Sequence, residues 1–264
     1  MFPTTCPVCR QEFARAGWAT LCDECWKGLE PWTGPACNRC GLPFASEFAA
    51  ASTEPLCADC RREEFRFDLT RSFGLYKGEL RTVILQLKYL RRRRLGIKLG
   101  KLLAPLWVSI PESNGNQLPL LVPVPLHKTR ERARGFNQAE ALARGLSAQL
   151  AALSGKRVAR VSTKCVERTR PTVPQAGLSL RQRHENVRGV FRVPSPECVH
   201  ERTIVLVDDV MTTGATLSSC ASSLKKAGAS WIYGLTLARA TPMFPDVLTV
   251  SPLDPVDDLG LGRR

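Results

Sequence analysis

The 264-residue sequence contains no uninterrupted apolar run that approaches the roughly 18 residues needed to span a bilayer. Its beginning, residues 1–6, has neither the basic segment nor the apolar segment of a secretory signal, so we expect a cytoplasmic protein. Apolar residues make up 44% of the chain, which is ordinary for a globular protein and disfavours a disordered or fibrous one. The length suits one full domain with a smaller module, or two modest domains.

Because thiols in the cytoplasm stay reduced, the 11 cysteines favour metal binding over disulfides. Eight of them form four C-x-x-C pairs within the first 60 residues: Cys6/Cys9, Cys22/Cys25, Cys37/Cys40 and Cys57/Cys60. Each pair can place two thiolates about one ion, and two pairs complete a tetrahedral zinc site with four cysteine ligands. We therefore predict two structural Zn²⁺ ions with no open coordination position, in a double zinc-binding module that covers residues 1–62.

Two questions about these cysteines stay open at the level of sequence. Sets of four cysteines also hold iron–sulfur clusters, so one site could take another metal. Sequential and cross-braced pairing of the four motifs both provide eight ligands. A thioredoxin-type redox pair is disfavoured because no βαβ pattern surrounds the motifs.

Charge is distributed unevenly along the chain. Residues 61–110 contain 13 Lys and Arg against 4 Asp and Glu, and residues 111–200 contain 15 against 6, which gives +9 in each segment. Residues 1–60 (4 against 7) and 201–264 (6 against 7) are mildly acidic. A basic middle suits a polyanion, either nucleic acid or a small phosphorylated substrate, although a solvated surface would have the same composition.

Strands that alternate with helices predict a parallel α/β sheet flanked by helices over residues 63–240. The apolar patterning predicts strands at 69–76, 118–126, 157–165, 203–207 and 231–238, and helices at 80–90, 95–106, 136–153 and 216–227. Residues 168–188 are basic, and Pro171 and Pro174 oppose regular structure at their start. Residues 241–264, which have four prolines and two glycines, are expected to form a flexible tail.

The most specific stretch outside the cysteines is residues 204–216, IVLVDDVMTTGAT. A buried strand is predicted to end at Asp208 and Asp209, and a loop rich in hydroxyls then opens a helix. Loop amides and a helix N-terminus bind phosphate, and Gly214 lets the backbone approach it. The two carboxylates can accept hydrogen bonds from hydroxyls or position a hydrated Mg²⁺. A sugar phosphate would satisfy both halves of such a site.

This stretch resembles the phosphoribosyl pyrophosphate-binding signature of type I phosphoribosyltransferases. The whole chain resembles the ComF family, which includes the competence ComFC and GntX-like proteins, over about residues 5–240. Besides the C-x-x-C pairs, the matching segments are Leu87–Tyr89, Val122–Pro125, Arg134–Gln138, Arg168–Thr169, Gln175, Leu178, Arg183 and Asn186–Phe191. The resemblance implies a type I phosphoribosyltransferase-like sheet behind a small zinc-ribbon-like module.

The resemblance also implies a role for each matching position. Asp208 and Asp209 would hold the ribose hydroxyls, and Arg168 and Arg183 would belong to a mobile basic loop that closes over the substrate and excludes water. These four are the candidate catalytic residues. The 5′-phosphate would be bound by Thr212, Thr213, Gly214, Ala215 and Thr216. The pyrophosphate, accompanied by Mg²⁺, would be met by Lys88, Arg130 and Arg134.

Two functions follow from these expectations. In the first, an enzyme transfers ribosyl phosphate to an unidentified nitrogen acceptor and releases pyrophosphate, without a covalent nucleophile. In the second, the chain is a non-catalytic nucleic-acid-binding accessory factor for DNA uptake and competence that uses the fold as a ligand sensor. Its partners would be single-stranded DNA and competence-machinery proteins, and Arg91–Arg94 would contact the nucleic-acid backbone.

Overall fold

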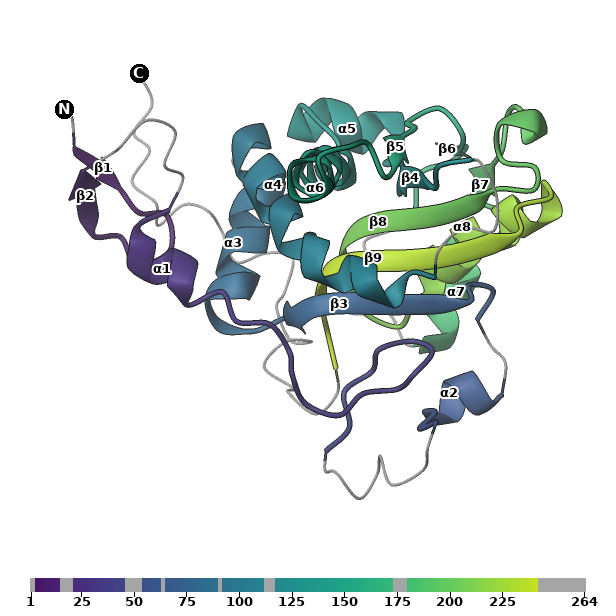
Figure 1. Ribbon diagram of the computed structural model, residues 1–264, viewed down its shortest axis with the longest axis horizontal. Coiled ribbons are helices and arrows are strands. Elements are labelled where there is room, and N and C mark those ends of the chain that lie inside the picture. The colour runs from purple at the N-terminus through teal and green to yellow at the C-terminus, as the bar shows by residue number, and fades with distance from the viewer. Residues whose placement is uncertain are drawn as a thin grey trace.

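A computed structural model describes residues 3–14, 21–45, 54–62, 65–89, 92–111, 117–172 and 180–241, apart from the side chains of residues 3, 4, 14, 180, 181, 183 and 184. Its centre is a parallel sheet with helices on both faces, and the N-terminal segment extends along one side (Figure 1). The predicted tail falls almost wholly outside the described residues, as do Gln175 and Leu178.

Five parallel strands form the central sheet in the order β3-β9-β8-β4-β5. They are β3 (Leu69–Leu75), β4 (Leu120–Pro123), β5 (Arg160–Val161), β8 (Thr203–Met211) and β9 (Trp231–Arg239). β8 and β9 are apolar along most of their length because both faces of a parallel sheet are covered. The predicted parallel α/β sheet is therefore confirmed.

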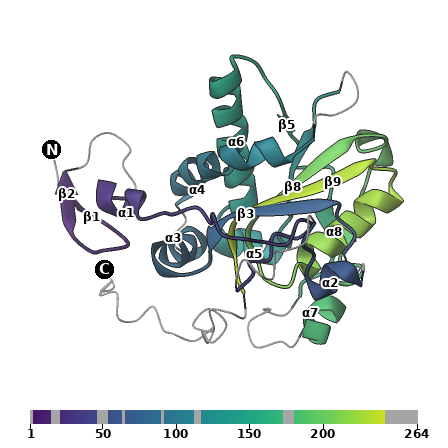
Figure 2. The ribbon, with the colours of Figure 1, turned by 60° about the horizontal axis from the view of Figure 1, so that its bottom comes forward.

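The central sheet divides the core into two layers, and helices cover each of them. One face carries α3 (Gly78–Tyr89), α4 (Arg93–Gly100), the 3₁₀ helix η2 (Lys101–Ser109) and α6 (Gln138–Ser154). That layer includes Val205 and Val207 of β8, whereas Ile204 and Leu206 point to the opposite layer with α8 (Ala215–Lys226). The helix α7 (Leu180–Val187) packs on α8, as the rotated view shows (Figure 2).

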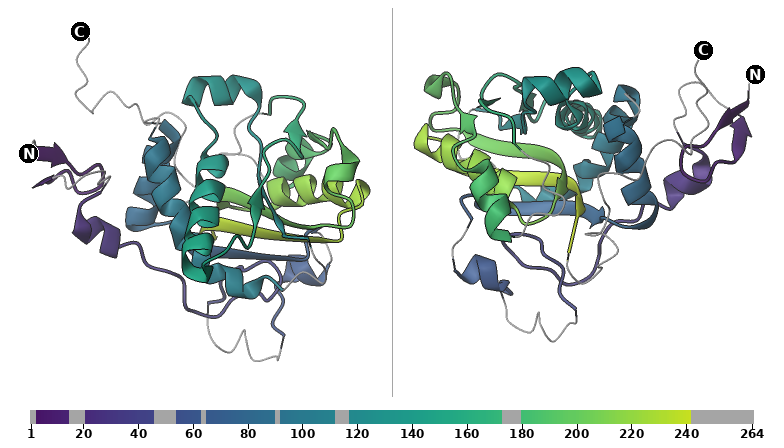
Figure 3. Two further views of the ribbon diagram at one scale, coloured as in Figure 1. Left: turned by 45° about the horizontal axis from the view of Figure 1, so that its top comes forward. Right: turned by 180° about the vertical axis from the view of Figure 1, so that it is seen from behind.

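Short elements complete the fold. The helix α5 (Lys128–Arg134) follows β4, and β6 (Glu167–Arg168) pairs antiparallel with β7 (Phe191–Arg192) ahead of the 3₁₀ turn η3 (Pro196–Cys198). The N-terminal segment contains β1 (Pro3–Thr5), β2 (Glu12–Ala14), α1 (Asp23–Lys27) and α2 (Ala58–Arg61). In every view β1, β2 and α1 lie at one end of the molecule and α2 at the other (Figure 3). Across the described residues, no helix combines the length and apolar character that crossing a membrane requires.

Two predicted elements differ from the structure, and the helix α5 was not predicted at all. The single helix predicted at 95–106 is an α-helix that changes to a 3₁₀ helix at residue 101, and Pro105 inside the second part offers no amide donor. The strand predicted at 157–165 is reduced to two residues. The helix α5 was not predicted, because its seven residues are charged or small and none is buried.

Candidate functional site

The strand β8 continues through both adjacent carboxylates. The prediction that it ends at Asp208 and Asp209 is wrong, because residues 208–211 keep their pairing with β9 up to Met211 opposite Arg239. Neighbouring residues of a strand point to opposite faces, so the two carboxylates diverge. The loop itself is short and consists of residues 212–214, after which α8 begins.

The loop turns on Gly214, whose φ of 80° lies in the left-handed region. A Cβ at this position would lie 2.8 Å from both the Met211 Cε and the Phe65 Cε1 atoms, so the packing as well as the backbone requires glycine. The Ala215 amide donates to the Thr213 hydroxyl over 3.3 Å. Ala215 and Thr216 stand in the first turn of α8, where the positive end of the helix dipole suits a phosphate.

Charge at the carboxylates is only partly compensated. Lys88 Nζ lies 3.3 Å from Asp209 Oδ1, and the Asp209 amide donates to Asp208 Oδ1 over 2.8 Å. Burial, followed by the charge of Asp209, raises the pKa of Asp208 to about 7, although Lys88 and Arg168 oppose the shift. Burial is the strongest single influence on Lys88 and acts to lower its pKa, but the charges of Asp209, Tyr76 and Asp208 together outweigh it, so the pKa of Lys88 is raised.

The basic residues implied by the resemblance gather around this pair. Arg168 Nη2 donates to the Thr172 hydroxyl, and Arg130 Nη2 donates to the Thr172 carbonyl over 2.7 Å. Burial, and then the charge of Arg130, lowers the pKa of Arg168, which Asp208 acts to raise. The Arg168 guanidinium also lies 5.5 Å from the centre of the Phe191 ring. Two arginines and a carboxylate thus share one partly buried environment.

Arg134 stands at the end of α5, and its charge acts to lower the pKa of both Lys88 and Arg130. For the pKa of Lys88, burial and the opposing charge of Asp209 are stronger influences than Arg134. For the pKa of Arg130, only burial is stronger. Lys88, Arg130, Arg134 and Arg168 therefore form a connected cationic group beside the two aspartates. The backbone of Arg183 lies in α7, and its side chain is outside the description.

The eight paired cysteines gather into two clusters. In each, the four sulfur atoms all lie within 4.8 Å of one another. The first cluster is Cys6, Cys9, Cys22 and Cys25, and the second cluster is Cys37, Cys40, Cys57 and Cys60. The pairing is sequential, which answers the question that the sequence left open.

The donor chemistry of both clusters fits Zn²⁺. Four sulfurs with no other donor are the ligand set of a closed structural site. In the second cluster, hydrogen bonds from Cys40, Cys57 and Cys60 lower the pKa of Cys37, while contacts with the other thiols raise the pKa of Cys60. Four buried thiols cannot all ionise together unless a cation compensates their charge.

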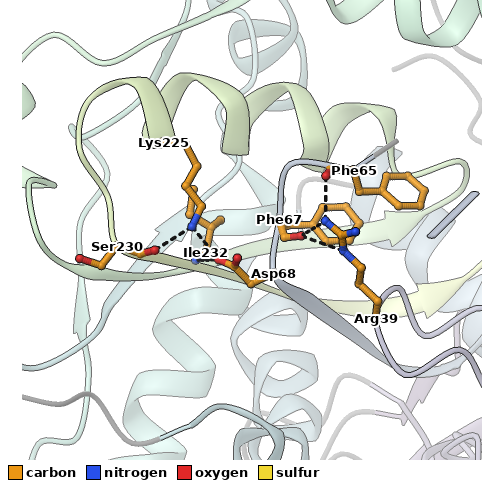
Figure 4. Close-up of polar contacts among 7 residues, drawn as sticks. All are labelled: Arg39, Phe65, Phe67, Asp68, Lys225, Ser230 and Ile232. Carbon is orange, nitrogen blue, oxygen red and sulfur yellow. Dashed lines mark hydrogen bonds and ion pairs between the residues drawn. The ribbon is translucent and has the colours of Figure 1, made fainter. Parts of the chain in front are cut away.

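Two arginines that contact the surroundings of the loop at residues 212–214 were not predicted from the sequence. Arg239, at the end of β9, is 4% exposed and donates to the carbonyls of Met211, over 3.1 Å, and Thr212. Arg39, between two cysteines of the second cluster, donates to the Phe65 carbonyl over 2.9 Å (Figure 4). One signal was available for Arg239: it is the only charged residue in the apolar run 231–239.

The chain is similar to a known domain family and to known bacterial proteins. Residues 1–61 match the family model described as a double zinc ribbon domain. The chain is 32% identical over 238 residues to the DNA utilization protein YhgH of Escherichia coli O6:H1, covering 90% of this chain and 97% of that protein. It is 31% identical over 222 residues to competence protein F of Haemophilus influenzae, covering 83% and 90% of the two chains.

Solved structures with partial similarity include two enzymes. The allosteric regulatory enzyme of purine biosynthesis aligns with a TM-score of 0.36 at 18% identity, over 58% of this chain and 29% of that one. The hypoxanthine phosphoribosyl transferase of Trypanosoma cruzi aligns with a TM-score of 0.32 at 12% identity, over 58% and 66% of the two chains.

Proposed function

The chain belongs to the ComF family, and from that premise we propose that it binds phosphoribosyl pyrophosphate with Mg²⁺ at the loop that follows β8. One observation carries the proposal: the aspartate pair stands beside a glycine turn and a helix N-terminus, within a group of four cationic side chains. A ligand with a diol, a phosphate and a pyrophosphate needs these three kinds of partner together. Thiolate zinc ligands also need a reducing compartment, which favours the cytoplasm.

Each group would act on one part of the ligand. The backbone amides at residues 213–216 would bind the 5′-phosphate, and Asp208 and Asp209 would accept hydrogen bonds from the ribose hydroxyls. Lys88 and Arg134 would face the pyrophosphate. Carboxylate oxygens at Asp208 and Asp209 fit the ligand preference of Mg²⁺, which when bound would neutralise the pyrophosphate charge.

The reaction that suits this arrangement is transfer of the ribosyl phosphate. The bond between the anomeric carbon and the pyrophosphate oxygen breaks, a bond to an acceptor nitrogen forms, and the acceptor loses its proton to a base or to solvent. The protein's contribution is to hold the two reactants in place and to stabilise charge on the departing pyrophosphate through Arg130 and Arg168. No covalent nucleophile is needed.

A second candidate function is nucleic-acid handling in DNA uptake. The observation that favours it is the start of α4, where Arg93 and Arg94 are exposed a few residues after Tyr89, which is 63% exposed. Arginine side chains can contact the phosphates of single-stranded DNA, and an aromatic ring can stack on its bases. Arg91 lies outside the described residues. Such binding would weaken steeply with salt and would not depend on the aspartates.

Calorimetric titration with phosphoribosyl pyrophosphate and Mg²⁺ tests the first proposal. The wild-type chain should bind one ligand, and the Asp208→Asn/Asp209→Asn variant should bind at least about 100-fold more weakly, because two charged hydrogen-bond acceptors are lost. Asp68→Asn is the matched control, since Asp68 pairs with Lys225 where β9 begins (Figure 4). Equal affinity in the double variant and the wild type would exclude this site.

A pyrophosphate-release assay with purine, pyrimidine and amine acceptors then separates an enzyme from a sensor. Release that requires an acceptor and disappears in the double variant establishes transfer. Ligand binding without release by any acceptor, together with salt-sensitive binding of single-stranded DNA that Arg93→Ala/Arg94→Ala weakens, establishes the accessory role instead.

A further inference from the structure

The second cluster contacts the residues that lead into the loop of residues 212–214, which we call the phosphate loop after its proposed ligand. Its four cysteines are all buried and belong to the same apolar core as Met211, at the end of β8, and Leu217, in the first turns of α8. The Thr70 hydroxyl lies at hydrogen-bonding distance from both the Cys40 carbonyl, at 3.0 Å, and Met211 Sδ, at 3.3 Å. One side chain therefore contacts the cluster backbone and the residue before the loop.

Arg239 connects the same two parts by charge. Its Nη1 donates to the carbonyls of Met211 and Thr212, the last residue of β8 and the first of the loop. Burial lowers the pKa of Arg239, while the charge of Cys40 acts to raise it. Its Nε is buried and has no hydrogen-bond partner among the described residues. A buried guanidinium is stable only where nearby negative charge compensates it.

A second connection runs through Arg39. Its guanidinium donates to the carbonyls of Phe65 and Phe67 (Figure 4), and the Phe65 and Phe67 rings stack with their centres 4.8 Å apart. The Phe65 ring closes the space above the Cα of Gly214. The segment between Cys37 and Cys40 thus holds the aromatic ring that confines the turn of the loop.

We propose that Arg239 is a positioning residue that couples the second cluster to the phosphate loop. With Zn²⁺ bound, Cys40 would be a thiolate whose charge would hold the Arg239 guanidinium, which in turn donates to the carbonyls of Met211 and Thr212. Loss of the metal would then loosen the loop before the sheet unfolds. The inference rests on the proposed function only where it concerns affinity for phosphoribosyl pyrophosphate.

Such coupling must be reciprocal. If the metal in the second cluster raises the affinity of the loop for its ligand, then the ligand raises the affinity of the second cluster for metal by the same factor. Couplings between two sites in a protein usually correspond to factors of about 5 to 150. The first cluster provides a matched control, because Cys9, which is exposed, and Cys22, which is partly exposed, can be replaced without touching this core.

Hydrogen exchange on the zinc-loaded full chain tests the coupling without a ligand. In Arg239→Met the amides of residues 212–216 should exchange at least about tenfold faster, while those of α6 keep their wild-type rates and the zinc content stays at two ions. Cys9→Ser/Cys22→Ser should lose one ion and leave the loop rates unchanged. If Arg239→Met fails to fold, Arg239→Lys replaces it, because lysine keeps the positive charge but lacks the planar fork of donors that the guanidinium offers. Wild-type loop rates in a folded Arg239 variant would overturn the proposal.

Zinc competition tests the reciprocal effect. Two samples of the Cys9→Ser/Cys22→Ser variant are titrated with a zinc-selective chelator. Both samples contain Mg²⁺, and only one contains phosphoribosyl pyrophosphate. The ligand should raise the zinc affinity at least about fivefold, and adding Arg239→Met should abolish the increase. An increase that survives Arg239→Met would overturn the assignment to this residue. If the wild type binds no ligand at all, the proposed function fails, while the exchange experiment still decides the coupling.

Discussion

The two cysteine clusters have the same motif and the same number of ligands, but they differ in their surroundings. The first cluster leaves Cys9 exposed and Cys22 partly exposed, at the end of the molecule marked by β1, β2 and α1 (Figure 1). All four ligands of the second cluster are buried in the core that also contains Met211. Similar motifs thus produce one site that is exposed on one side, although Cys6 and Cys25 pack in the core with Phe73, and one site that is wholly buried.

The proposed coupling means that a structural metal site supports function through the residues that contact it. Both clusters are closed and neither offers a coordination position to a substrate. The second cluster nevertheless reaches the phosphate loop through Thr70 and Arg239. The boundary predicted at residue 62 divides the sequence into two parts, but in the structure contacts join residues on its two sides.

The largest effect is expected from removing ligands of the second cluster. Cys40→Ser/Cys60→Ser should lower the free energy of unfolding by more than about 5 kcal/mol, because structural zinc sites contribute on the order of 10 kcal/mol and these thiols lie in the core. Cys9→Ser/Cys22→Ser should keep a cooperative thermal transition of the α/β domain, followed by circular dichroism. Equal loss of the transition in both variants would remove the distinction between the clusters.

A smaller effect is expected at Asp208, on the loop side of the comparison. Its pKa in the folded state, about 7, lies above its ordinary value of 3.8, so the folded chain holds the proton longer and stability falls as pH rises between these values. Asp208→Asn should therefore stabilise the protein, by up to about 4 kcal/mol above pH 7 and by less at pH 6. Urea unfolding at pH 6 and pH 8 measures this, and a gain that does not grow with pH would contradict it.

The fit between Phe65 and Gly214 gives the next effect. Gly214 and Gly155 both have a left-handed φ, but a Cβ at Gly155 would meet nothing within 4 Å. Gly155→Ala should therefore cost about 1 kcal/mol, and Gly214→Ala should cost roughly 2 kcal/mol more because it also displaces Met211 and the Phe65 ring. Chemical denaturation of both variants provides the comparison. Equal costs would mean that the aromatic ring does not confine the loop.

The smallest effects are expected from exposed ion pairs near each cluster. Lys27 and Glu24 stand beside the first cluster, and Arg62 and Asp59 beside the second. Glu24→Gln and Asp59→Asn should each shift the Tm by less than about 2 °C, because solvent screens such pairs. A large shift at only one of them would assign the difference between the clusters to surface charge instead of burial.

Much of this architecture could be predicted from the sequence. Strands with continuous apolar runs, such as 203–207 and 231–238, were found because burial on both faces leaves a clear pattern. The extension of β8 to Met211 was missed because two adjacent aspartates are atypical of a strand, and only pairing with β9 keeps them there. The helix α5 lacks an apolar face, so periodicity could not reveal it.

The candidate site was predictable where residues are neighbours in sequence. The aspartate pair and residues 212–216 share one motif, whereas Lys88, Arg130 and Arg168 come together only through tertiary packing. The grouping of eight cysteines into two sequential clusters likewise needed the structure, since both pairings satisfy the ligand count. Arg239 was not predictable as a coupling residue, because its partners Cys40 and Thr212 are distant in sequence.

The most direct test of the difference between the clusters is a chelator titration of the wild-type protein. Zinc release and the binding of phosphoribosyl pyrophosphate with Mg²⁺ are followed together in the same samples. We predict that the first zinc equivalent leaves with ligand binding intact, and that binding is lost together with the second equivalent. Loss of binding with the first equivalent, or binding that survives the removal of both, would contradict this account.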